Sequence, residues 1–97
     1  MCYNFFMHDK EEEKKVIRLL KTAKGQIDGL LKMIDEDRYC VDISTQIIAT
    51  TSILKKVNLE ILSGHMNYCV KDAFENNCSD KQEKLDEVVT ILNKLLR

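Results

Sequence analysis

Histidine and cysteine stand four residues apart at His65 and Cys69. On an α-helix this spacing puts both side chains on one face, with Cβ atoms about 6 Å apart, a separation that a metal ion can bridge. A thiolate beside an imidazole suits copper(I), zinc, nickel or cobalt better than magnesium or calcium. The same pair is compatible with a core thiol next to a surface histidine, so the spacing alone leaves both interpretations open.

Cys40 offers a further soft ligand, but it lies 25 residues before His65. Both residues fall within one predicted helix, which would separate them by roughly 37 Å if the helix is straight. Cys40 therefore cannot share a metal ion with His65 of its own chain. In an antiparallel pair of chains, Cys40 of one chain meets His65 and Cys69 of the other, and two equivalent sites result. Metal binding would then be coupled to quaternary geometry, as a sensor requires.

Three amphipathic helices are predicted to position these residues, over about Asp9–Ile34, Tyr39–Phe74 and Lys81–Leu96. Asp9 is a plausible N-cap of the first helix, and Ser79 or Asp80 of the third. In each helix, apolar side chains recur at three- and four-residue spacing, which is typical of a helix with one buried face. The stripes are Val16, Leu20, Ala23, Ile27, Leu30, Leu31 and Ile34; Ile43, Ile47, Leu54, Val57 and Ile61; and Leu85, Val88, Val89, Leu92 and Leu95.

The composition favours a single all-α domain over residues 1–97, with residues 1–8 as a flexible N-terminus. The chain has no proline, only three glycines and 32% charged residues. A chain of this length buries only roughly 60–65% of its unfolded surface, so one protomer alone would be marginally stable. A single 97-residue partner cannot cover the whole apolar stripe of the long second helix. The simplest solution is an antiparallel homodimer built as a helical bundle.

Several classes of protein are not expected. The net charge of −1 lacks the basic excess of a general nucleic-acid binder, so DNA contact would have to come from local patches. No apolar run approaches the roughly 20 residues of a membrane span, and the start MCYNFFMHDK has no signal-peptide pattern, so a cytoplasmic location without membrane partners is expected. No phosphate loop or acid–base motif is visible, so neither an enzyme nor a small-molecule substrate is expected.

The run DRYCVDISTQIIATTSILKKVNLEILSGHMNYCV resembles the centre of the CsoR/RcnR family of metal-sensing repressors. The preceding KGQIDGLLKMI resembles the first helix of that family. The Tyr-Cys-Val-Asp, Thr-Gln-Ile and His-x-x-x-Cys elements carry the resemblance. It covers residues 18–74 well and the last helix loosely.

The resemblance implies a three-helix protomer, an antiparallel dimer with a four-helix core, and usually a homotetramer. The copper-sensing members bind copper(I) through Cys, His and Cys, which match Cys40, His65 and Cys69 here. Tyr39 and Glu87 match positions that link metal binding to DNA release. The apo oligomer would bind operator DNA as a repressor, and copper(I) would release it.

Two other signals stay open within the same family. His8 matches the N-terminal position that nickel and cobalt sensors use as a fourth ligand, and an N2S2 set would suit Ni(II), Co(II) or Zn(II). A thiol or persulfide sensor would use Cys40 and Cys69, although the persulfide-sensing branch lacks the histidine found here. Cys2 and Cys78 are interpreted as bystander thiols, with Cys78 alternatively a resolving partner in redox chemistry.

DNA contact in the family is attributed to basic residues of the first two helices. The matching candidates are Lys14, Arg18, Lys21, Lys24, Lys55 and Lys56. Lys14, Arg18 and Lys21 share one helix face by spacing and would neutralise phosphates. Leu19 and Thr22 replace positions that are commonly basic in the family, which leaves a metal-buffering protein without a DNA role as an alternative.

Overall fold

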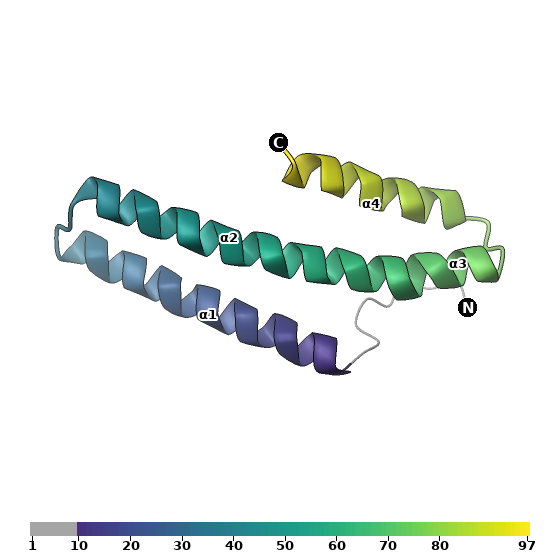
Figure 1. Ribbon diagram of the computed structural model, residues 1–97, viewed down its shortest axis with the longest axis horizontal. Coiled ribbons are helices and arrows are strands. Elements are labelled where there is room, and N and C mark those ends of the chain that lie inside the picture. Colours follow the sequence, from purple (N-terminus) through teal and green to yellow (C-terminus); the bar gives the residue numbers. More distant parts are fainter. Residues whose placement is uncertain (1–9) are drawn as a thin grey trace.

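The computed structural model describes residues 10–97, and the regular structure in that range is entirely helical (Figure 1). α1 spans Lys10–Asp35 and α2 spans Cys40–Gly64. The same rod continues through a π-helical turn, η1, at His65–Val70 and through the short α3 at Lys71–Glu75. After a turn, α4 spans Lys81–Leu95.

The all-α prediction is confirmed, and the three predicted helices match the three rods to within one residue at each described end. The N-cap predicted at Asp9 and the flexible segment predicted at 1–8 lie outside the described residues. Asp80 does take the N-cap position of α4, as predicted, but its side chain makes no capping hydrogen bond there.

Both turns between the rods are closed by a residue in the left-handed region. Asp37 has φ 53° and Asn77 has φ 50°, and these residue types tolerate that conformation better than most. In each turn the next N–H bonds to a carbonyl five residues back, at 2.9 Å for Arg38 and 2.8 Å for Cys78. This bond satisfies carbonyls left open at the helix end, so both rods stop cleanly.

α1 runs antiparallel along α2, while α4 folds back along η1 and α3 (Figure 1). Two polar contacts fix the α1–α2 register. The Thr50 hydroxyl lies 2.8 Å from Oε1 of Gln26, and Nζ of Lys15 lies 2.7 Å from Oε1 of Glu60. The α4 side is held by an apolar cluster of Leu62, Val70 and Val88, with Leu85, Leu92 and Leu95 packed against it.

The protomer is a thin plate of 56 × 29 × 13 Å. A helix with its side chains is about 10–12 Å across, so the plate is one helix thick. The predicted stripes are consequently covered only in part: Val16 and Val57 are buried, but Leu31 and Ile34 remain 62% and 60% exposed. Large apolar surfaces of α1 and α2 are therefore left for another chain. None of the helices in residues 10–97 has the length and apolar character that a membrane crossing requires.

Candidate metal centre and nucleic-acid interface

His65 and Cys69 both lie in η1, where the helix is wider than an α-helix. The N–H of Lys71 reaches back five residues to the carbonyl of Met66, which is the hydrogen bond of a π-turn. Such turns are rare within α-helices and occur frequently at functional sites. The sequence predicted an uninterrupted α-helix through Gly64 and did not reveal the π-turn.

The two side chains in η1 differ in exposure. Cys69 is buried, with 3% of its surface exposed, and its thiol is free of any disulfide. His65 is half-buried. Burial lowers the pKa of His65 from its ordinary value of 6.5, and the Lys84 ammonium lowers it further, while the Glu87 carboxylate partly opposes both. The imidazole is therefore neutral near pH 7, the state in which it can bind a metal ion.

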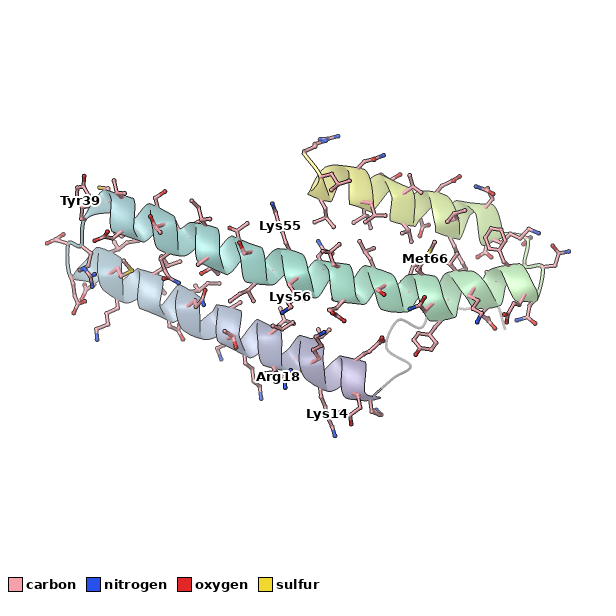
Figure 2. All side chains as sticks on the ribbon, in the orientation of Figure 1. Lys14, Arg18, Tyr39, Lys55, Lys56 and Met66 are labelled. Carbon is pink, nitrogen blue, oxygen red and sulfur yellow. The ribbon has the colours of Figure 1, made fainter. Side chains whose placement is uncertain are left out.

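Cys40 lies at the opposite end of the rod from this pair. It is the first residue of α2 and carries an exposed, free thiol. The 25-residue α2 begins at Cys40 and ends directly before η1 of the same chain. Figure 2 shows that the two ends of α2 lie far apart, with Tyr39 at one end and Met66 just beyond the other. Within residues 10–97 no three His, Cys, Asp or Glu side chains lie close enough to hold a metal ion. One protomer therefore brings together two of the three predicted ligands.

Tyr39 and Glu87, which were predicted to support the metal ligands, lie at opposite ends of the α2 rod. Tyr39 is the N-cap of α2, next to Cys40, with 69% of its surface exposed. Glu87 is an exposed residue of α4, and its carboxylate acts electrostatically on His65. Glu87 therefore lies on the His65 side of the protomer and Tyr39 on the Cys40 side.

Sequence reasoning missed Lys84, a lysine with only 4% of its surface exposed. Its ammonium acts electrostatically on the His65 imidazole, as the Glu87 carboxylate does, and lowers the pKa of His65. A signal was present in the periodicity, because Lys84 stands four residues before the buried Val88 and thus on the inward stripe of α4. Lysine at such a position is unusual, since lysines are almost never fully buried unless paired.

The basic residues of α1 form a continuous surface. Lys14, Arg18 and Lys21 line one open hollow of about 530 Å³, together with Ile17 and Thr22. In Figure 2 the side chains of Lys14 and Arg18 point away from α2. Lys24 is exposed farther along α1. The prediction that the first three share one helix face is confirmed, and we call these three residues the basic face.

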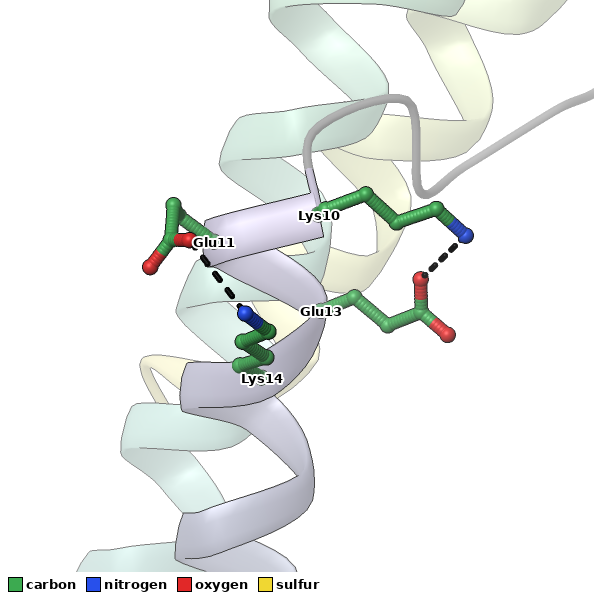
Figure 3. Close-up of polar contacts among 4 residues, drawn as sticks. All are labelled: Lys10, Glu11, Glu13 and Lys14. Atoms are coloured by element: carbon green, nitrogen blue, oxygen red, sulfur yellow. Dashed lines mark hydrogen bonds and ion pairs between the residues drawn. The ribbon is translucent and has the colours of Figure 1, made fainter.

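The members of the basic face differ in whether a nearby carboxylate neutralises their charge. Nζ of Lys14 lies 3.5 Å from Oε1 of Glu11, and Lys10 pairs in the same way with Glu13 at 3.4 Å (Figure 3). Arg18 has no acidic partner among residues 10–97. Lys21 has none there either, so Arg18 and Lys21 are better placed than Lys14 to attract a phosphate.

The two lysines predicted on α2 point in different directions. Both Lys55 and Lys56 are exposed. Lys56 points toward the α1 side of the rod, whereas Lys55 points to the opposite side (Figure 2). Within one protomer, Lys56 can extend the surface that α1 presents, and Lys55 cannot. His8 and Cys2 lie outside the described residues. Cys78 is buried in the turn before α4 and is disulfide-bonded, so its interpretation as a bystander thiol is wrong.

We expect the imidazole of His65 in the metal-free protein to titrate below the ordinary value of 6.5. Because the unfolded chain takes up this proton more readily than the folded chain, the free energy of unfolding should fall as pH drops below about 6.5. Glu87→Gln removes the carboxylate that raises the pKa of His65, so it should lower that pKa further. NMR titration of the imidazole measures both effects, with the exposed Glu83→Gln as control. A pKa at or above the ordinary value, or one insensitive to Glu87→Gln, would contradict this electrostatic picture.

Comparison with known proteins places this geometry in a family. Residues 12–94 match the family described as metal-sensitive transcriptional repressors, which are regulators and not enzymes. Two similar relatives are the copper-sensing transcriptional repressor RicR of Mycobacterium tuberculosis strain H37Rv and the copper-sensing transcriptional repressor CsoR of Bacillus subtilis strain 168. RicR is 34% identical over 90% of this chain and 91% of its own length. CsoR of B. subtilis is 34% identical over 93% of this chain and 88% of its own length.

Two solved structures share the fold. The copper-sensing repressor CsoR with Cu(I) from Geobacillus thermodenitrificans NG80-2 superposes with a TM-score of 0.82 at 30% identity, covering 97% of this chain and 96% of that one. The nickel-responsive transcriptional regulator InrS superposes with a TM-score of 0.68 at 28% identity, covering 92% of this chain and 98% of that one. The family match spans nearly the whole chain, and the fold agrees with it. This protein therefore belongs to the family of metal-sensitive transcriptional repressors.

Proposed function

We propose that this protein is a copper(I)-responsive repressor whose metal site is formed by Cys40 of one protomer and by His65 and Cys69 of its partner. The observation that carries the proposal is the split ligand set. The buried Cys69 thiol and the neutral His65 imidazole share one π-turn, and Cys40, the other cysteine outside a disulfide among residues 10–97, stands a full helix away. The likeness to CsoR with Cu(I) over 97% of the chain supports the choice of metal.

The donor set fits copper(I) chemically. Two thiolates and one imidazole are soft to intermediate ligands, and such sets select copper(I) over hard cations. Copper(I), when bound, supplies a soft cation that ties ligands from two chains together. The chain itself keeps the His65 imidazole neutral and shields the Cys69 thiol from bulk water. Tyr39 and Glu87, one beside each half of the site, would orient the ligands.

The proposed assembly is an antiparallel homodimer, two of which form a homotetramer. Its support is the plate-like protomer, one helix thick, with apolar residues such as Ile48 left 66% exposed. Antiparallel pairing of two α2 helices covers this surface and brings Cys40 beside the π-turn of the other chain. We further propose that residues 1–97 form one regulatory domain, since the family match covers 12–94, and that it acts on operator DNA in the cytoplasm.

The proposed DNA surface is the basic face of α1, extended by Lys24 and Lys56 and, across the assembly, Lys55. An ion pair connects this surface to the metal site. Lys15 lies between Lys14 and Arg18 in sequence, and its ammonium is 2.7 Å from Glu60, five residues before His65 on the same rod. A rearrangement of η1 on metal binding would shift the end of α2 and, through this contact, the first turns of α1. Coupling of this kind typically changes affinity by about 5- to 150-fold.

Anaerobic addition of copper(I) should weaken binding to a fragment carrying the protein's own promoter by roughly 5- to 150-fold, as typical allosteric coupling implies. Cys40→Ala should abolish this response while leaving DNA binding of the metal-free protein intact, because it removes only one ligand. Ser52→Ala, which changes an exposed residue of α2 outside the proposed ligand set, is the control. Fluorescence anisotropy with labelled DNA measures each affinity. Unchanged DNA affinity of the wild-type protein at saturating copper(I) would refute the proposed function.

Arg18→Ala should weaken DNA binding by a similar factor for all sequences and reduce the slope of log affinity against log salt by about 1, because it removes one phosphate contact. Lys94→Ala removes an exposed cation from α4, far from the proposed surface in sequence, and should leave the slope unchanged. Anisotropy titrations over a range of salt concentrations provide the measurement. If both variants behaved alike, the basic face would not be the DNA surface, and the metal-buffering alternative would gain support.

A nickel sensor is the second candidate, favoured by the likeness to the nickel-responsive InrS at 28% identity. It would add His8 to the three proposed ligands, and zinc or cobalt would fit the same four-ligand set. In the DNA-release experiment this candidate predicts a response to Ni(II) that His8→Ala removes. Thiol or persulfide sensing by Cys40 and Cys69, neither of which is in a disulfide, stays a prediction, which mass spectrometry after polysulfide treatment would check.

A further inference from the structure

Lys84 stands on the face of α4 that packs against η1. Its surface is only 4% exposed, and Val88, one turn later, belongs to the apolar cluster with Leu62 and Val70. Leu85, the next residue, packs on the same cluster. The packing therefore fixes the stem of Lys84 beside the π-turn that carries His65 and Cys69.

Two carboxylates, those of Asp80 and Glu87, accompany the Lys84 ammonium, and water screens the three charges to different degrees. Nζ of Lys84 lies 3.6 Å from Oδ2 of Asp80, but the Asp80 side chain is 40% exposed, whereas that of Lys84 is 5% exposed. Glu87 is exposed. Both Lys84 and Glu87 act electrostatically on His65. Water screens exposed charges far more strongly than buried ones, so the ammonium of Lys84 contributes the most persistent field at the imidazole.

The charge of the occupied site depends on the metal. Two cysteine thiolates, a neutral imidazole and copper(I) sum to −1, whereas the same ligands with a divalent ion sum to zero. A lysine ammonium, positive at neutral pH, balances the first site and leaves the second with an excess positive charge. The preference arises from the ion's charge alone and does not require that Lys84 touch the metal.

Building on the proposed function, we propose that Lys84 is a specificity-determining residue, a buried cation that favours a monovalent over a divalent ion at the Cys40–His65–Cys69 site. It acts through the field at the site and not as a ligand. The same position would weaken binding of Zn(II) or Ni(II) to a site whose soft ligands otherwise accept them. The fold thus supplies a charge filter in addition to the ligand set.

The test is Lys84→Met, which keeps an unbranched apolar stem of similar length and removes the charge. Copper(I) and Zn(II) affinities of the full-length protein are measured by anaerobic competition with chromophoric chelators. The ratio of copper(I) to Zn(II) affinity should fall roughly tenfold, the scale of one unit charge acting through an effective dielectric of about 20. Lys94→Met, an exposed lysine of the same helix, should leave the ratio unchanged. Circular dichroism verifies folding, and Lys84→Gln serves as a second neutral variant should Lys84→Met unfold.

Asp80→Asn separates the charge filter from a structural role of the Lys84–Asp80 contact. It removes the partly screening carboxylate and keeps the ammonium, so the ratio should stay equal or rise. Equal losses of both metals in Lys84→Met and Asp80→Asn would show a structural role and overturn the inference. If the wild-type protein binds copper(I) but the ratio is unchanged in Lys84→Met, the inference fails and the proposed function stands. A wild-type protein that binds Zn(II) and not copper(I) would contradict both.

Discussion

The length of α2 is the constraint on which the rest of the structure depends. Its 25 residues form a rigid spacer between Cys40 and the pair His65 and Cys69. The same helix is too long for α1 and α4 to enclose, and the protomer is consequently a plate 13 Å thick with apolar residues exposed on it. The proposed second chain, antiparallel to the first, would complete the divided ligand set and cover the exposed apolar surface. In the proposed assembly, metal binding and subunit packing therefore depend on the same contact.

The π-turn η1 is where the functions proposed for different parts of the chain converge. It carries His65 and Cys69, it receives α4 through Val70 and Val88, and it directly follows the turn of α2 that holds Glu60. The hydrogen bond of a π-turn spans one residue more than that of an α-turn. The helix can therefore change its rotation at this turn without unfolding. A shift there would reach α4 through the apolar cluster and α1 through the Lys15–Glu60 ion pair. This arrangement gives a physical route from ligand to basic face.

The sequence was sufficient to predict the helices and insufficient for the details that tune the site. Apolar periodicity located all three rods, because this signal is local. The π-turn was not predictable, since the segment from Gly64 to Val70 shows no break in pattern and its hydrogen bonds depend on tertiary packing. Lys84 was overlooked because a lysine is ordinarily assigned to the surface, although its spacing from Val88 placed it on the inward stripe. The roles assigned to Cys40, His65, Cys69, Tyr39 and Glu87 stay predictions that the geometry accommodates.

The central claim is that the metal site spans two chains, and mixed dimers test it most directly. A Cys40→Ala chain and a Cys69→Ala chain, carrying different affinity tags, are co-expressed and the doubly tagged species is isolated. Each homodimer lacks a complete ligand set under any arrangement. If the site spans two chains, the mixed dimer holds one intact site, with Cys40 from one chain and His65 and Cys69 from the other. Anaerobic copper(I) titration should then find one site of wild-type affinity per mixed dimer. The absence of any such site would contradict the account.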